Sequence, residues 1–292
     1  MMTDNIDQIR NTVREQYGAM VRSASSCCGP STDTNGCCSP AVDPAALASA
    51  IGYDAEELSR ILPEGANLGL SCGNPGAIAS LKLGEMVLDL GSGAGFDVFL
   101  CGPKVGPMGR VIGVDMTPEM LKKARNNIAG YTQRTGLNNV EFRMGEIEHL
   151  PVADACIDVV ISNCVINLSA DKTQVWREIA RVLKPGGRVA VSDMVLLKPL
   201  PETIRSAVEA YIGCIAGAAT ATELKQMMED ASLSSIRLES KSAYVEKLSK
   251  GDDPLYQSFR SALPSGASPA DYITSMDIRA IKSKPCCGSQ CC

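Results

Sequence analysis

The sequence is poor in histidine and aromatic residues, and it has no long apolar run. Its 292 residues include a single histidine, His149, and aromatic residues make up only 4% of the chain. A metal site built from several histidines is therefore excluded. The absence of any run of about 18 apolar residues argues against a membrane-spanning helix. The net charge of −5 argues against nucleic acid as a partner, because phosphate backbones are bound by basic surfaces.

The amino terminus also shows no export signal. Its first ten residues, MMTDNIDQIR, contain acidic side chains and lack the apolar stretch of about 7–15 residues that a secretory signal carries. Hydrophobic residues make up 45% of the chain and charged residues 21%, as in ordinary globular proteins. We therefore predict a cytoplasmic protein, in which cysteines pack, bind soft ions or act as transient redox partners.

Cysteine, by contrast, is abundant, with 13 residues. That is under the share of about 8–10% that marks a small disulfide scaffold. Eight cysteines form four adjacent pairs near the two ends of the chain: Cys27-Cys28, Cys37-Cys38, Cys286-Cys287 and Cys291-Cys292. The other five are isolated: Cys72, Cys101, Cys156, Cys164 and Cys214.

The middle of the chain has the pattern of a doubly wound α/β domain. Between residues 77 and 195, short β-branched apolar runs such as MVLDL, RVIGVDM and IDVVISN alternate with segments of helical character. Strands that are apolar on both faces and alternate with helices predict a parallel sheet covered on both sides. The expected fold is a mostly parallel, Rossmann-like sheet.

The flanking segments differ in character from this domain. Residues 1–76 are predicted to hold a helix at 5–22, a cysteine-bearing loop and a cap over the main domain. Residues 196–284 are predicted to form a smaller substrate-binding region. The last eight residues, 285–292, contain too few apolar groups to pack and predict a flexible cysteine tail.

A glycine-rich turn follows the first predicted strand. Asp89 precedes the sequence GSGAG at 91–95, and Asp115 ends the next strand, 24 residues after Gly91. Glycines let the backbone approach a ligand closely, and a carboxylate at the end of the second strand can accept hydrogen bonds from ribose hydroxyls. Two alternatives remain open: a purely structural turn, and a solvated carboxylate at Asp115.

Residues 80–195, including KPGG at 184–187, resemble the class I S-adenosylmethionine-dependent methyltransferases. The resemblance implies that Asp115 holds the ribose of the cofactor, that Met116 flanks the adenine and that the backbone near Glu146 and Ile147 meets the edge of the base. The cofactor-binding residues implied by this resemblance are Asp89, Gly91, Ser92, Gly93, Asp115, Met116, Glu146, Ile147 and Asn163.

Three of the isolated cysteines are placed where they could meet a substrate. Cys164 follows Asn163 at the carboxyl end of the fourth strand, the edge where such sheets bind ligands. Cys72 lies in a loop with Gly and Pro upstream of the sheet, and Cys214 lies in the appended region. The cysteine spacing fits zinc poorly. A trivalent ion such as As(III), bound by three thiolates, keeps a lone pair that can attack a methyl group.

Five segments carry a closer resemblance to the arsenite S-adenosylmethionine methyltransferases. They are LGLSCGNP (68–75), LDLGSGAGFDVFL (88–100), NCVINLS (163–169), SDMV (192–195) and YIGCIAGA (211–218). The resemblance implies that Cys72, Cys164 and Cys214 bind arsenic. It also implies an amino-terminal redox cysteine, for which Cys37 or Cys38 is the candidate, and a role for Tyr17 in closing the cofactor pocket.

The implied reaction is methylation of arsenite and then methylarsenite, as part of arsenic detoxification. The arsenic would arrive free or as a thiol conjugate. Each transfer leaves arsenic pentavalent, so two electrons must come from thiols. A disulfide between Cys72 and a cysteine of the 27–38 loop could supply them, with glutathione or thioredoxin restoring the thiols. The enzyme is expected to act as a monomer.

The remaining cysteines and the lone histidine receive simpler interpretations. Cys101 and Cys156 are expected to be small packing residues, and His149 to be structural. The tail cysteines Cys286, Cys287, Cys291 and Cys292 could relay arsenic transiently or be dispensable. Two other functions stay open: methylation of a carbon or oxygen of a small metabolite, such as a quinone precursor, and metalloid binding without turnover.

Overall fold

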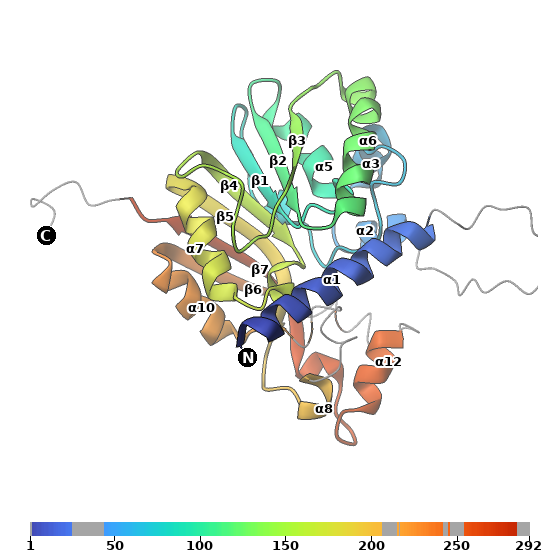
Figure 1. The fold of residues 1–292 in the computed structure, drawn as a ribbon, viewed down its shortest axis with the longest axis vertical. Helices are drawn as coiled ribbons and strands as arrows, with labels where there is room; N and C mark the ends of the chain where they lie inside the picture. Colours follow the sequence, from blue (N-terminus) through green and yellow to red (C-terminus); the bar gives the residue numbers. More distant parts are fainter. Residues whose placement is uncertain are drawn as a thin grey trace, which may run out of the picture.

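The computed structural model describes residues 2–24, 44–205, 215, 217–241, 245 and 254–284. Its centre is a seven-stranded sheet in the order β3-β2-β1-β4-β5-β7-β6 (Figure 1). The strands are β1 (Met86–Leu90), β2 (Arg110–Asp115), β3 (Val140–Met144), β4 (Ile157–Asn163), β5 (Leu183–Leu196), β6 (Leu233–Lys241) and β7 (Ile273–Lys282). The first five strands pair in parallel, and β7 runs antiparallel to both of its neighbours. The predicted Rossmann-like α/β class is confirmed.

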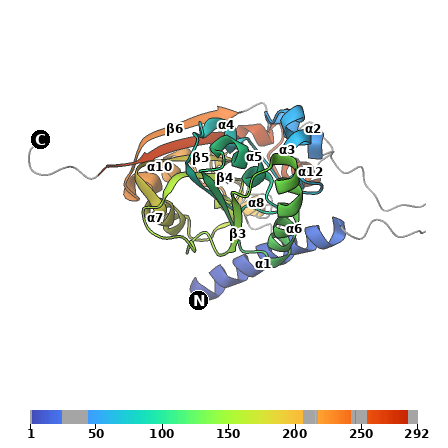
Figure 2. The same cartoon turned by 90° about the horizontal axis from the view of Figure 1, so that it is seen from above.

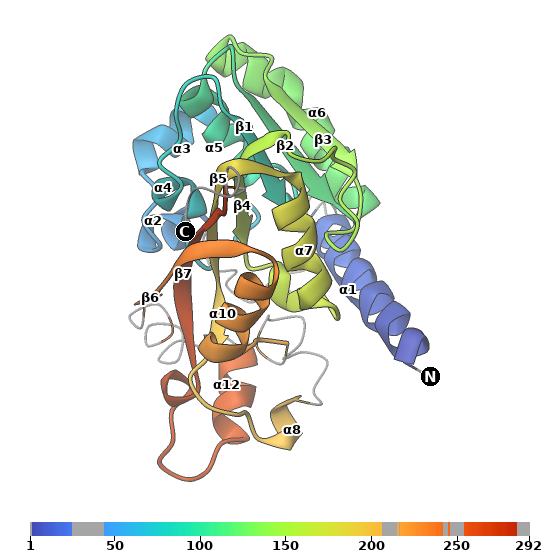
Figure 3. The ribbon, with the colours of Figure 1, turned by 90° about the vertical axis from the view of Figure 1, so that its left-hand side faces the viewer.

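Helices cover both faces of this sheet (Figures 2 and 3). The amino-terminal half contributes α1 (Met2–Ala24), α2 (Pro44–Ala50), α3 (Ala55–Ile61), α4 (Pro75–Ile78), α5 (Phe96–Val105) and α6 (Pro118–Thr135). The second half contributes η1 (Ile166–Leu168), α7 (Lys172–Val182), α8 (Glu202–Arg205), α10 (Ala221–Asp230), α12 (Pro254–Ser261) and η2 (Pro269–Asp271). In Figure 3, α3, α4 and α5 lie on one side of the sheet, and α7 and α10 lie on the other.

The strand residues alternate between the two layers, as a period of two requires. Leu88 and Leu90 of β1 belong to the core cluster that α7 and α10 complete. Val87 of the same strand belongs to the cluster under α3, α5 and α6. Trp176 of α7, the only tryptophan of the chain, is fully buried in the first cluster. Burial on both faces explains why these strands read as continuous apolar runs.

The sheet continues beyond residue 195, where the strand pattern of the sequence fades. β7 buries polar side chains as well as apolar ones, among them Thr274, Ser275 and Asp277. β6 forms the sheet edge and alternates buried or half-buried positions with exposed ones. Neither strand has the apolar signature of β1 to β5. Residues 196–284 therefore supply two strands of the central sheet as well as helices.

The amino-terminal helix α1 crosses the sheet at the carboxyl ends of the strands (Figure 1). It confirms the helix predicted at 5–22. The buried Val13 faces the interior, and α1 packs beside α6. None of the helices that the structure describes is long and apolar enough to cross a membrane.

Candidate active site

A pocket opens at the carboxyl ends of β1, β2 and β4, beneath α1. Nine of the residues predicted to bind a cofactor line it: Tyr17, Asp89, Gly91, Ser92, Gly93, Asp115, Met116, Ile147 and Asn163. The predicted residues from α1 and from four strand ends therefore come together at one edge of the sheet. This is the edge at which doubly wound sheets bind ligands.

The glycine-rich turn has a backbone that only glycine adopts easily. Gly91 has a φ of 66°, and a Cβ at this position would lie 2.4 Å from Cγ2 of Val165. Gly95 has a φ of 94°, and a Cβ there would lie 2.6 Å from Phe99. Both positions combine left-handed backbone with close approach of a neighbour. Glycine is therefore required at both positions for the turn to pack against the protein, and Gly91 and Gly93 of this turn line the pocket.

Asp115 stabilises this turn as well as facing the pocket. Its Oδ2 accepts a hydrogen bond from the backbone N–H of Gly93 at 2.9 Å, and its Oδ1 accepts one from Thr117 at 2.8 Å. Burial raises the pKa of Asp115, and these N–H groups oppose the shift. Each carboxylate oxygen has a second lone pair, so ribose hydroxyls could still donate to Asp115.

Three carboxyl groups crowd the floor of the site: Asp89, Asp97 and Asp115. Burial raises the pKa of Asp89 well above its usual value, and the charges of Asp97 and Asp115 raise it further. Burial also raises the pKa of Asp97, although Tyr53 and Asn163 donate hydrogen bonds to it. Such a cluster favours a cation, since a positive charge relieves the repulsion. A sulfonium cofactor with an amino group, such as S-adenosylmethionine, fits this requirement.

Glu146 does not line the pocket with its side chain. Its carboxylate pairs with Arg10 at 3.4 Å and with Arg14 at 3.5 Å, both on α1. Glu148 lines the pocket instead, and it accepts a hydrogen bond from Ser169 Oγ at 2.6 Å. Only backbone groups of this segment were predicted to meet the cofactor, and Glu148 was not predicted. Glu146 ties α1 to the rim of the pocket.

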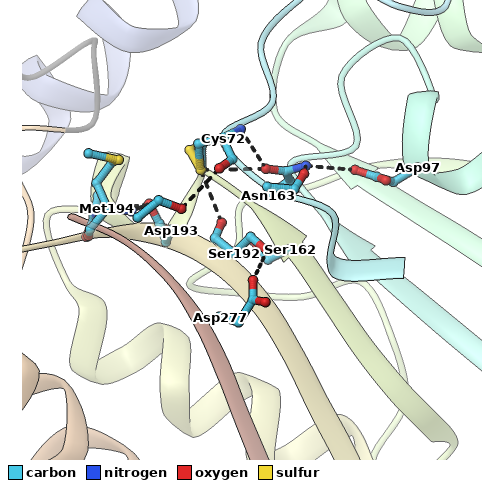
Figure 4. Close-up of a disulfide and its surroundings, with 12 residues drawn as sticks. Cys72, Asp97, Ser162, Asn163, Ser192, Asp193, Met194 and Asp277 are labelled. Carbon is cyan, nitrogen blue, oxygen red and sulfur yellow. Dashed lines mark hydrogen bonds between the residues drawn. A yellow bond between two sulfur atoms is a disulfide. The ribbon is translucent and has the colours of Figure 1, made fainter. Parts of the chain in front are cut away.

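Cys72 and Cys164 meet at the same edge of the sheet, as their positions in the sequence predicted. Their Cα atoms are 6.0 Å apart, and their sulfur atoms form a disulfide (Figure 4). Cys164 lines the cofactor pocket, and Cys72 is 4% exposed. The two candidate ligands are therefore oxidised here instead of being free thiols. In this structure the partner of Cys72 is Cys164. The cysteines of the 27–38 loop, which were predicted to form a disulfide with Cys72 during turnover, lie outside the described residues.

Asn163 connects the Cys72 loop to the end of β4. Its Oδ1 accepts the backbone N–H of Cys72 at 3.1 Å, and its Nδ2 donates to the carbonyl oxygen of Gly73 at 2.8 Å. Nδ2 also lies 3.2 Å from Asp97 Oδ2, and Asp97 Oδ1 accepts from Tyr53 Oη at 2.6 Å. Asn163 was predicted as a site residue, whereas Tyr53 and Asp97 were not. This hydrogen-bond network fixes the position of the Cys72 backbone.

Asp193 lies next to the two sulfur atoms and was not predicted as a site residue. Its carboxylate and the sulfurs of Cys72 and Cys164 lie within 4.8 Å of one another. Burial raises the pKa of Asp193 to about 7, although backbone N–H groups and the charge of Lys172 oppose the shift. In the sequence, Asp193 appears only within the motif SDMV (192–195), which contributes to the family resemblance but assigns no role to this residue.

Other predicted residues lie away from this site or outside the described residues. Cys101 lies on α5 and is buried in the core, as a packing residue would be. Cys156 is half-buried, and its thiol donates to the carbonyl oxygen of Ala153. His149 is exposed and does not line the pocket. Seven predicted cysteines lie outside the described residues: Cys37, Cys38, Cys214, Cys286, Cys287, Cys291 and Cys292.

Comparisons with known proteins agree with this fold. Residues 81–232 match the family model described as a methyltransferase domain. An arsenite methyltransferase of Halobacterium salinarum is 46% identical over 249 residues, which are 84% of this chain and 62% of that protein. An arsenite methyltransferase of Aquipseudomonas alcaligenes is 43% identical over 164 residues, 55% of this chain and 47% of that protein.

A solved structure shares the fold over a similar length. The arsenic(III) S-adenosylmethionine methyltransferase of Chlamydomonas reinhardtii is 29% identical, with a TM-score of 0.58, and the match covers 83% of this chain and 75% of that one. The chain spans between about half and two thirds of the length of the two curated relatives. It therefore belongs to the methyltransferase domain family, and its sequence is similar to those of arsenite methyltransferases.

Proposed function

We propose that this chain methylates trivalent arsenic, with S-adenosylmethionine as the methyl donor. The observation that carries the proposal is the position of the sulfur pair. Cys164 lines the cofactor pocket and lies within bonding distance of Cys72. Two sulfur atoms beside a methyl donor are suited to a soft, thiophilic substrate. A carbon or oxygen acceptor would have no use for them.

When bound, S-adenosylmethionine supplies a methyl group on a positively charged sulfonium. The residues that would hold it are the glycine-rich turn, Asp89 and Asp115, with α1 closing the pocket through Val13 and Tyr17. The buried carboxylates offset the positive charge of the donor. The protein contributes mainly by positioning, because a sulfonium needs little acid or base assistance.

The substrate would be held by thiolates at the mouth of this pocket. Cys72 and Cys164 supply two of them once an external thiol has reduced their disulfide. Cys214 is the proposed third ligand, on the strength of the family resemblance. Arsenic bound by thiolates keeps its lone pair, which is the nucleophile for the methyl group. The hydrogen bonds of Asn163 hold the backbone at Cys72 in position for this step.

We further propose that methylarsenite follows arsenite as substrate and that the pathway serves arsenic detoxification in the cytoplasm of the cell. Glutathione or thioredoxin returns the thiols to their reduced form, with Cys37 or Cys38 as a further redox cysteine. The tail cysteines relay arsenic to the site. The enzyme works as a monomer.

Replacement of Cys164 by serine tests the proposal. The Cys164→Ser variant should lose nearly all transfer of labelled methyl groups from S-adenosylmethionine to arsenite. Its affinity for S-adenosylmethionine should change little, because the glycine turn and Asp115 remain. Cys156→Ser is the matched control, since this cysteine is half-buried and lies away from the pocket. Full arsenite methylation by Cys164→Ser would contradict the proposal.

A further inference from the structure

The sulfur pair has a third neighbour, the carboxylate of Asp193 on β5 (Figure 4). Asp193 is 3% exposed, so its charge is removed from solvent. One of its oxygens and the sulfurs of Cys72 and Cys164 all lie within 4.8 Å of one another. A ligand that bridges the two sulfurs would therefore also come within reach of this carboxylate.

The two oxygens of Asp193 differ in their surroundings. Oδ1 accepts hydrogen bonds from Asn167 Nδ2 at 2.9 Å and from the backbone N–H of Met194 at 2.8 Å. Oδ2 is buried and accepts no hydrogen bond of ordinary geometry from the described residues, although the backbone N–H groups of Ile166 and Asn167 act on the same carboxyl group. A buried polar atom without a partner is unfavourable, and more so if it is charged. Oδ2 is therefore an acceptor that a bound molecule could satisfy.

We propose that Asp193 accepts a hydrogen bond from the hydroxyl group that arsenite keeps after two thiols have bound it. This inference rests on the proposed function. Two external thiols first reduce the disulfide and are themselves joined in a disulfide. The thiols of Cys72 and Cys164 then react with As(OH)3. Two As–O bonds break and two As–S bonds form, and each thiol proton leaves with a hydroxide as water. Arsenic stays trivalent, and its one remaining hydroxyl donates to Oδ2 of Asp193.

The same contact makes Asp193 a specificity-determining residue. Methylarsenite, CH3As(OH)2, loses both of its hydroxyls when two thiols bind it. It then has no O–H group to donate, so Asp193 gives it no hydrogen bond. Asp193 thus favours inorganic arsenite over methylarsenite while the arsenic is bound by two thiols. A third thiol, such as Cys214, would later displace the last hydroxyl as water and end the contact.

The test uses Cys214→Ser to stop loading at two thiols, with and without Asp193→Asn. Asparagine preserves the oxygen that Asn167 and Met194 contact and replaces the free oxygen by an amide NH2. The full-length protein, reduced with a phosphine, is titrated with arsenite and with methylarsenite at about pH 8, and bound arsenic is measured after equilibrium dialysis. Asp193→Asn should weaken arsenite binding about tenfold or more and methylarsenite binding less than about twofold.

The outcomes separate this inference from the proposed function. An equal loss for the two arsenicals, or no loss for arsenite, would overturn the role of Asp193 alone. If the reduced protein bound neither arsenical, the proposed function would fall with it. X-ray absorption at the arsenic edge gives a second measurement: with arsenite, Cys214→Ser should show two sulfurs and one oxygen around arsenic. A site without an oxygen ligand would contradict the inference.

Two further variants guard against effects on folding. Asp277→Asn is the matched control, because Asp277 is a buried carboxylate on the adjacent strand β7, bound to Ser192 and Lys241. It should change neither affinity by more than about twofold. Asp193→Ala removes the acceptor altogether, in case the asparagine variant does not fold. Binding of S-adenosylmethionine reports that each variant is folded.

Discussion

The side-chain oxygen of Asn163 accepts the backbone N–H of Cys72 at 3.1 Å, across 91 positions of the chain. This contact holds a loop that precedes the sheet against the carboxyl end of β4. Because Cys164 follows Asn163 directly, one residue positions both members of the sulfur pair. This arrangement explains why the two cysteines lie close together.

Asn163→Ala should separate the two cysteines. The variant loses the bonds to Cys72 and Gly73, so the Cys72 loop is no longer fixed over the site. We expect arsenite methylation to fall roughly tenfold and oxidation of the reduced pair to its disulfide to slow by a similar factor. Both rates are measured with the purified, reduced protein.

Asn139→Ala is the control for this variant. Asn139 is also a buried asparagine, with hydrogen bonds to Tyr131, Gly102 and Gly106, but it lies away from the pocket. Its loss should destabilise the fold by about 1–3 kcal/mol without slowing disulfide formation. If the two variants slowed disulfide formation equally, Asn163 would have no positioning role.

Gly91→Ala should disrupt the cofactor site. The added Cβ would lie 2.4 Å from Val165 on a backbone with φ of 66°, so the turn must shift. We expect the dissociation constant for S-adenosylmethionine to rise about tenfold or more, as measured by calorimetry. Gly84→Ala is the matched control, because Gly84 has a φ of 83° with nothing within 4 Å of its added Cβ. Equal affinity in the two variants would contradict a role of the turn in binding.

Asp193 should make the protein less stable as the pH rises. Burial raises its pKa from 3.8 to about 7, so the folded state holds a proton that the unfolded state releases between these values. The contribution of protonated Asp193 to the free energy of unfolding is fully present below about pH 4. It is lost as the pH rises through about 7. Asp193→Asn removes the titration. Relative to the wild type it should gain a few kcal/mol between about pH 4 and pH 8, measured by urea unfolding. A constant difference across this range would contradict the shift.

Glu146→Gln should loosen α1 over the pocket. It weakens the ion pairs with Arg10 and Arg14, whose helix brings Tyr17 to the pocket. Partly exposed pairs contribute little, so affinity for S-adenosylmethionine should fall only about two- to fivefold, and high salt should reduce the difference. Glu141→Gln is the control, because Glu141 pairs with Arg110 and Arg143 away from the pocket. A difference that salt leaves unchanged would count against this tether.

The sequence predicts the parallel half of the sheet well because those strands are apolar on both faces. Val87 and Leu88 pack into different layers, and both appear in the sequence as one apolar run. β7 could not be recognised in this way, because it buries polar residues such as Ser275 and Asp277. Their burial is tolerated because partners elsewhere in the fold satisfy their polar groups. Tertiary contacts, not local pattern, decide its place in the sheet.

The same distinction separates the predicted from the unpredicted site residues. Asp115 and the glycine-rich turn have a fixed spacing along the chain, so they could be identified from the sequence. Asp193 reaches the site from β5 and Tyr53 from the loop between α2 and α3, and only the fold brings these segments together. Nothing in the sequence around Asp193 distinguishes a carboxylate that faces two sulfurs from one that faces solvent.

The most direct test of the central claim is arsenic speciation. The reduced protein is incubated with arsenite, glutathione and methyl-labelled S-adenosylmethionine, and the products are separated by chromatography with elemental detection of arsenic. The account predicts labelled methylarsenicals and an equal amount of S-adenosylhomocysteine. Arsenic that is bound but never methylated, or methyl transfer only to a carbon or oxygen of another small molecule, would contradict it.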